Sequence, residues 1–165
     1  YLTADYSEHT EDVTLNGLTT VSTVATDIFR INYVEVVQSA NGANTAFNVG
    51  DIIASNGGTE YGYVEAGENI ALSTVYTVPK DKIGYLYSMC GSSDSGKSVT
   101  FSLVIREPDT PPHVHQHLEI YQTSACRDNI VMFRLAEGSD IEVRAISSAA
   151  GAHVEATYSL FIVDR

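Results

Sequence analysis

The chain has 165 residues, of which 21 are Asp or Glu and nine are Lys or Arg, so its formal net charge at pH 7 is −12. Phosphate backbones bind clustered positive charge, and the nine basic residues are scattered, so we expect no nucleic acid partner. No apolar run approaches the roughly eighteen residues of a membrane-spanning helix, so we expect no membrane partner either.

The residue types favour an all-β protein. Val, Thr, Ile and Tyr are common, ten residues are Tyr and none is Trp, and no segment repeats apolar residues with the helical period. The length predicts one domain, residues 1–165, large enough to bury a core. Two cysteines make no disulfide framework, so we expect Cys90 and Cys126 to be free thiols. Because the chain opens on Tyr1 directly in a predicted strand, we also expect further residues before it.

In the first half of the chain, short alternating segments are separated by turn residues. Asn16-Gly17 and Asn56-Gly57-Gly58 are strong hairpin signals, because these residues tolerate the left-handed conformation of tight turns. A loop rich in small residues is expected at 39–45. The strands predicted here are 1–4, 11–15, 18–24, 28–38, 50–55, 60–65 and 72–78.

The second half begins with two alternating segments around a Ser/Asp/Gly loop. The first places Ile83, Tyr85, Tyr87 and Met89 on one face, and the second places Val99, Phe101, Leu103 and Ile105 on one face. The two segments predict a β-hairpin with Gly96 in its turn. The later predicted strands are 113–122, 129–135, 141–146 and 153–163, with 123–128 as a loop.

The loop of that hairpin also fits a nucleotide-binding pattern. Residues 91–98, GSSDSGKS, match G-x-x-x-x-G-K-[ST], which holds phosphates only between a strand and the first turn of a helix. The residues after Ser98 alternate with period two and predict a strand, so we reject the nucleotide-binding interpretation. The whole pattern predicts an antiparallel β-sandwich, jelly-roll-like, in one domain.

The best metal candidate is the segment HVHQHLE at 113–119. On a strand, side chains of equal parity share a face, so His113, His115, His117 and Glu119 would project together. The spacing H-x-H-x-x-x-E resembles the first motif of the cupins, which would assign metal ligation to His113, His115 and Glu119. Two departures stand against it. Glu107 and Cys126 occupy positions where cupins have glycine, and no second cupin motif follows Leu135. The simpler interpretation is a polar strand face sensitive to pH.

No arrangement of catalytic residues is evident. The sequence has neither a G-x-S-x-G elbow nor a cysteine-protease neighbourhood, and its acidic pairs are typical of solvated turns. We therefore expect no catalytic residues, no cofactor and no enzymatic activity.

Six stretches in order resemble a family of tailed-bacteriophage virion proteins. They are EDVTLNG (11–17), IFRIN (28–32), VGDI (49–52), YTVPK (76–80) with the strand from Gly84, SDIEVRA (139–145) and FIVD (161–164). The histidine-bearing segment is not part of this resemblance, so no role for it can be transferred.

The resemblance implies a non-enzymatic structural protein located in the virion. It would be a capsid decoration or cement protein, or alternatively a tail or fibre component. Its partners would be the major capsid protein or other virion subunits, and it would form homo-oligomers. Two further alternatives are a cupin-like metal-binding protein and a glycan-binding module that stacks tyrosines on sugars.

Overall fold

The computed structural model of the protein describes residues 1–37, 47–94, 97–121 and 123–165. It is all-β, and the described residues contain no helix. They therefore include no helix that could cross a membrane. The chain divides into two compact units, an N-terminal unit, Tyr1–Ser73, and a C-terminal unit, Thr74–Arg165. Each unit is described by itself below. The predicted boundaries of a single domain, 1–165, stay a prediction.

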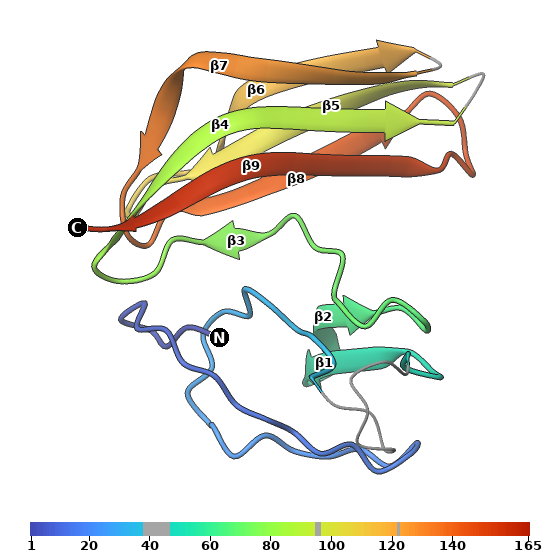
Figure 1. The fold of residues 1–165 in the computed structure, drawn as a ribbon, viewed down its shortest axis with the longest axis vertical. Coiled ribbons are helices and arrows are strands. Elements are labelled where there is room, and N and C mark those ends of the chain that lie inside the picture. Colours follow the sequence, from blue (N-terminus) through green and yellow to red (C-terminus); the bar gives the residue numbers. More distant parts are fainter. Residues whose placement is uncertain (38–46, 95–96, 122) are drawn as a thin grey trace. The chain divides into compact units, whose positions relative to one another are not determined.

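The described residues form nine strands (Figure 1). The N-terminal unit contains β1 (Ile52–Asn56) and β2 (Thr59–Val64). The C-terminal unit contains β3 (Tyr76–Thr77), β4 (Lys82–Ser93), β5 (Ser98–Arg106), β6 (His113–Tyr121), β7 (Ser124–Leu135), β8 (Asp140–Ser147) and β9 (Val154–Asp164).

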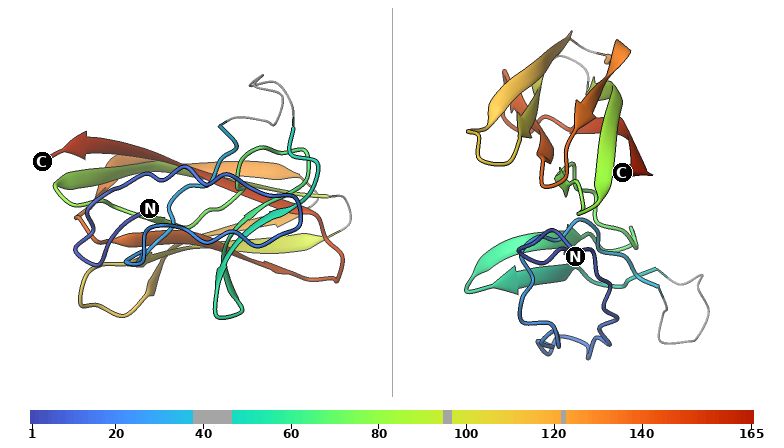
Figure 2. Two further views of the ribbon diagram at one scale, coloured as in Figure 1. Left: turned by 90° about the horizontal axis from the view of Figure 1, so that it is seen from below. Right: turned by 90° about the vertical axis from the view of Figure 1, so that its left-hand side faces the viewer.

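The C-terminal unit is an antiparallel β-sandwich, as the alternating pattern predicted. One sheet has the strand order β3-β8-β5-β6 and the other has the order β7-β4-β9. The views in Figure 2 show the two sheets as separate layers. The jelly-roll connection of the strands stays a prediction.

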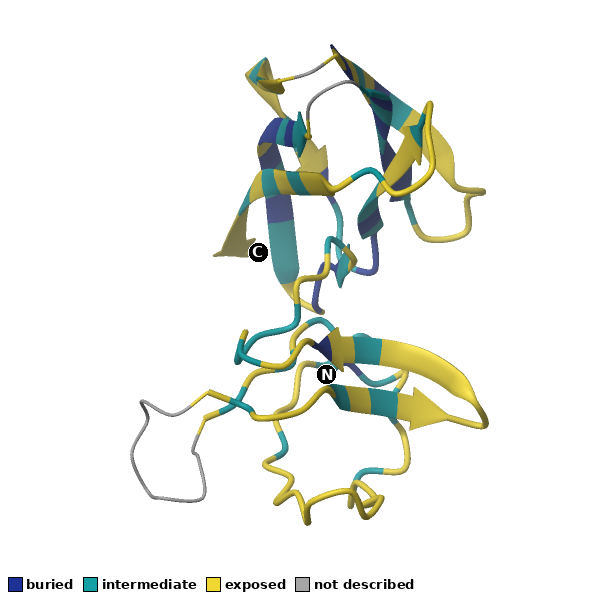
Figure 3. Cartoon of the chain, turned by 90° about the vertical axis from the view of Figure 1, so that its right-hand side faces the viewer, coloured by how far each residue is buried: buried dark blue, intermediate teal, exposed yellow. Residues whose placement is uncertain are grey.

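The core of the sandwich lies between the two sheets. The inward face of β5 carries Val99, Phe101, Leu103 and Ile105, all fully buried, as their shared parity predicted. Leu86 and Met89 of β4 contact them from the facing sheet. Buried positions therefore follow β4 and β5, whereas the outer strands are largely exposed (Figure 3).

The predicted hairpin between β4 and β5 is wrong. The two strands lie in different sheets, because each is central and already pairs on both edges. β4 pairs with β7 and β9, and β5 pairs with β6 and β8. Alternation identified both strands but cannot identify their partners. Gly96, the predicted turn residue, lies outside the described residues.

A bulge changes which face of β4 points inward. The register shifts between Leu86 and Ser88, so Leu86 and Met89 are both buried although their parity differs. Tyr87 is exposed. The prediction that Ile83, Tyr85, Tyr87 and Met89 share one face is therefore wrong, because a bulge reverses the alternation.

Gly91 provides the space for the largest core side chain. A Cβ at this position would lie 2.8 Å from two carbons of the Phe101 ring and 3.1 Å from the Ile120 side chain. Gly91→Ala should therefore overpack the core and lower the free energy of unfolding by about 1–3 kcal/mol, measured by denaturant titration. Gly50→Ala is the control, since a Cβ there meets nothing within 4 Å. A Gly91→Ala variant as stable as the Gly50→Ala variant would contradict the packing.

In the N-terminal unit, the predicted hairpin around Asn56-Gly57-Gly58 is confirmed. β1 and β2 pair antiparallel, and Gly57 and Gly58 take positive φ angles of 59° and 85°. Asn48 and Asn69 also clamp the unit by accepting each other's backbone N–H at 2.9 Å. Hydrogen bonds from side chains to the backbone thus stabilise the loops of this unit, which has few strands.

The strands predicted at 11–15, 18–24 and 28–37 do not form, and Gln38 together with the predicted loop 39–45 lies outside the described residues. The Asn16-Gly17 turn is present, with Gly17 at φ 56° and an Asn16–Thr19 bridge. The flanking segments have strand-like sequences but no described neighbouring strand to pair with. Residues 11–24 are almost all exposed, whereas the segment 28–37 is about half partly buried and makes isolated bridges from Arg30 to Leu2 and from Glu35 to Ile70.

Candidate functional site

The histidine-bearing segment forms β6, the edge strand of the four-stranded sheet, as predicted. The register to β5 shifts there, because Leu103 pairs with Gln116 while the next residue, Val104, pairs with Val114. His115 is thus the extra residue of a bulge. The alternation that was expected to align the histidines is interrupted at the middle one.

The three histidines have different surroundings. His115 is partly buried, with its ring centroid 4.2 Å from that of Phe133 on β7. His117 is exposed, and its Nδ1 lies 3.0 Å from the Ser102 hydroxyl. His113 is also exposed.

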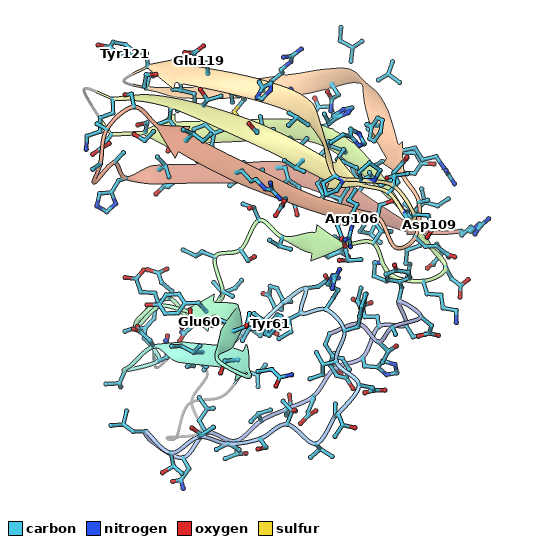
Figure 4. The ribbon with its side chains drawn as sticks, turned by 180° about the vertical axis from the view of Figure 1, so that it is seen from behind. Glu60, Tyr61, Arg106, Asp109, Glu119 and Tyr121 are labelled. Carbon is cyan, nitrogen blue, oxygen red and sulfur yellow. A yellow bond between two sulfur atoms is a disulfide. The ribbon has the colours of Figure 1, made fainter. Side chains whose placement is uncertain are left out.

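Glu119 projects from the outside of β6, near Tyr121 (Figure 4). Among the described residues, no three His, Cys, Asp or Glu side chains are grouped so that they could hold a metal ion. The candidates His113, His115 and Glu119 are therefore not brought together as ligands. The cupin-like hypothesis has no geometric support in the described part of the chain.

The environment of His115 makes it sensitive to pH. Desolvation by burial, with further contributions from the positive charges of His113 and Arg127, lowers the pKa of His115 below its usual 6.5. The folded protein then binds this proton more weakly than the unfolded chain. The contribution of neutral His115 to the free energy of unfolding is complete at pH values above the pKa that His115 has in the unfolded chain. It decreases as the pH falls from that value toward the lower pKa that His115 has in the folded protein.

Replacing His115 should reduce this acid sensitivity. We expect His115→Phe to lose less stability than the wild type between about pH 7.5 and about pH 5.5, measured by urea titration. His153→Gln, at an exposed position, should follow the wild type. Equal losses in the wild type and His115→Phe would show that the imidazole is not held in its neutral form.

The prediction of free thiols is wrong. Cys90 on β4 and Cys126 on β7 are directly paired across the strands and form a disulfide. The segment 123–128 was expected to be a loop, whereas β7 begins at Ser124. Once Cys126 is placed on a strand beside β4, the two thiols are close enough to bond. The presence of two cysteines was the available signal, but the pairing of β4 with β7 was not.

A depression of 170 Å³ lies over the disulfide, between β7, β4 and β9. It is lined by Cys90, Gly91, Ser92, Ser124, Cys126, Glu155, Ala156 and Thr157. Sites that enclose organic ligands commonly measure about 300–1,000 Å³ and converge several polar groups. This depression is smaller, so it does not define a ligand site.

The nucleotide-binding interpretation, rejected from the sequence, has no support in the structure. Ser98 begins strand β5, where a phosphate-binding loop would require a helix. Lys97 Nζ donates to the carbonyl oxygen of Gly151 at 2.9 Å. The lysine thus connects two loops of the sandwich.

The most prominent surface feature is the amount of exposed apolar side chain. Among the described residues, 26 large apolar side chains are exposed and 13 are buried. The imbalance is greatest in the N-terminal unit, where Leu2 and Val64 are the two buried members and 14 are exposed. The described large apolar side chains of the N-terminal unit thus lie mostly at its surface.

On the sandwich, β7 carries an apolar protrusion, which we define as Asn129–Met132. Phe133 pairs with Leu86 and Asp128 with Ser88, so these four residues stand opposite Tyr87 alone. Ile130 and Val131 within it are 104% and 81% exposed. β7 bends near its C-terminal end in Figure 1, and this bulge accounts for the bend.

Charge is divided unequally between the two units. The N-terminal unit has ten acidic residues and one basic residue, Arg30, a difference of −9. The C-terminal unit has eleven acidic and eight basic residues, a difference of −3. Contacts between two N-terminal units would therefore be repulsive, whereas the C-terminal unit offers the basic groups.

No family model, curated protein or solved structure matches this chain.

Proposed function

We propose that this protein is a non-enzymatic structural subunit of a bacteriophage virion, and specifically a capsid decoration or cement protein. It acts by contact, through surfaces presented to the major capsid protein and to other copies of itself. The ordered resemblance of six stretches to virion proteins supports the choice of a phage particle.

The observation that carries the proposal is the excess of exposed over buried large apolar side chains, 26 against 13 among the described residues. A monomeric protein seldom leaves apolar surface in such excess, whereas a subunit of a large assembly covers it with its neighbours. The acidic net charge of −12 keeps free copies soluble before assembly.

The candidates for chemistry agree with a role in contact. The histidines of β6 are not grouped as metal ligands in the described residues, and the depression over the disulfide is small. What the sandwich offers instead is long edge strands and protruding apolar side chains. Monomeric proteins cover, shorten or charge such edge strands to prevent pairing with other chains, whereas assemblies use them for contacts between subunits.

Quantitative mass spectrometry of purified particles, made from the phage genome that encodes the chain, tests the proposal. We expect the chain at a copy number comparable with that of the major capsid protein. Gold-labelled antibody raised against the purified chain should mark the outside of the capsid. A chain absent from purified particles would overturn the virion assignment, and label confined to the tail would overturn the capsid assignment.

A further inference from the structure

An acidic loop, which we define as residues 11–27, protrudes from the N-terminal unit. The Glu11 carboxylate closes its base by accepting the backbone N–H groups of Val24 and Ala25 at 2.6 and 3.0 Å. These two bonds lower the pKa of Glu11. The Glu11 side chain thus joins the two ends of the loop.

Within this loop both the apolar side chains and the backbone are open to contact. Leu18 is 107% exposed, Val24 is 89% exposed and Leu15 is 53% exposed. Among the described residues, Thr19 N–H to Asn16 C=O is the one backbone–backbone hydrogen bond made within residues 11–27. The loop has the alternating sequence of two strands but lacks the neighbour that strands require.

The charges on the loop and on the β7 protrusion are opposite. The loop contains three acidic residues, Glu11, Asp12 and Asp27, and no basic residue. The β7 protrusion is bracketed by the exposed Arg127 and Arg134, with Asp128 the one acidic residue in that stretch. The acidic loop therefore combines exposed apolar side chains with a charge of −3 from the two ends of its sequence, and the β7 protrusion combines exposed apolar side chains with a flanking net charge of +1.

We propose that the acidic loop of one copy docks on the β7 protrusion of a second copy. Leu18 and its apolar neighbours contact Ile130 and Val131, and the flanking carboxylates face Arg127 and Arg134. The contact joins two different surfaces, so copies associate head to tail and form rings or chains. Association through two N-terminal units is opposed by their charge of −9 each.

This inference deepens the homo-oligomer part of the proposed function, but it concerns the purified chain alone. A chain found in particles that does not self-associate would defeat the inference and leave the proposed function standing. A self-associating chain that is absent from particles would do the reverse.

Sedimentation velocity of the chain of residues 1–165 over a range of concentrations provides the test. We expect concentration-dependent association that weakens between about 0.05 M and about 0.5 M salt, because opposite charges at the contact are screened. Leu18→Asp and Ile130→Asp should each weaken association by at least about tenfold. Both residues are fully exposed, so neither change disturbs a core.

Two equally simple changes serve as matched controls. Val49→Asp in the N-terminal unit and Ile146→Asp in the C-terminal unit replace side chains that are 99% and 73% exposed. Neither lies in the acidic loop or in the β7 protrusion, so both variants should associate like the wild type.

Mixing the two interface variants gives the sharpest result. A Leu18→Asp copy retains an intact β7 protrusion, and an Ile130→Asp copy retains an intact acidic loop. Each variant alone should be monomeric, whereas an equimolar mixture should form complexes of two chains through the one intact contact. A mixture that stays monomeric, a wild type that is monomeric at every concentration, or control variants that dissociate equally would each overturn the proposal.

Discussion

Phe101→Ala should lower the free energy of unfolding of the C-terminal unit by about 3–5 kcal/mol. Phe101 is the largest fully buried side chain and lies between the two sheets, where its ring fills the space above Gly91. Removing the ring loses the free energy gained by burying it and leaves a cavity that the strands cannot close. Denaturant titration followed by tyrosine fluorescence measures the loss, since the chain has ten Tyr and no Trp.

Phe161→Ala is the matched control, because Phe161 is 51% exposed. Its replacement should change stability by no more than about 0.5 kcal/mol. If Phe101→Ala does not fold, Phe101→Leu should still fold with a smaller loss. Equal effects of the changes at Phe101 and Phe161 would contradict the placement of the core.

Removal of the disulfide should have the second large effect. Cys90 and Cys126 are 36 residues apart in sequence, and closing a loop of that length in the unfolded chain corresponds to about 4 kcal/mol in the chain-entropy model. The double variant Cys90→Ala, Cys126→Ala should therefore lose about 2–4 kcal/mol in denaturant titration.

Reduction provides an independent measurement on the natural sequence. A reducing agent should lower the stability of the wild type and leave that of the double variant unchanged. Thiol titration of the unreduced, denatured chain should detect no free thiol. Two thiols per chain in that assay would contradict the disulfide.

Alternation predicted the strands of the sandwich well because the local pattern and the buried face agree there. β5 shows this most clearly, since all four residues assigned to its inner face are fully buried. Strand pairing was not predictable, because alternation describes one strand and the pairing depends on the other. The bulges at Tyr87 and His115 were also not predictable from the sequence. Each bulge reverses the alternation of side chains on which the predicted faces of β4 and β6 depended.

The candidate sites depended on the same information. The disulfide requires that β7 lie beside β4, and the metal hypothesis required an uninterrupted β6. Neither condition can be read from a single segment. The alternating pattern of the acidic loop predicted two strands, 11–15 and 18–24, that do not form, because the described residues supply no neighbouring strand to pair with them.

Hydrogen exchange on the chain of residues 1–165 tests most directly whether another copy completes the acidic loop. At concentrations where sedimentation shows monomers, the amides of residues 11–27 other than the hydrogen-bonded ones of Thr19, Val24 and Ala25 should exchange rapidly, while those of β4 and β5 stay protected. In the associated state, residues 11–27 and 127–134 should gain protection together. Protection of residues 11–27 already in the monomer, or no gain on association, would contradict a head-to-tail contact between copies.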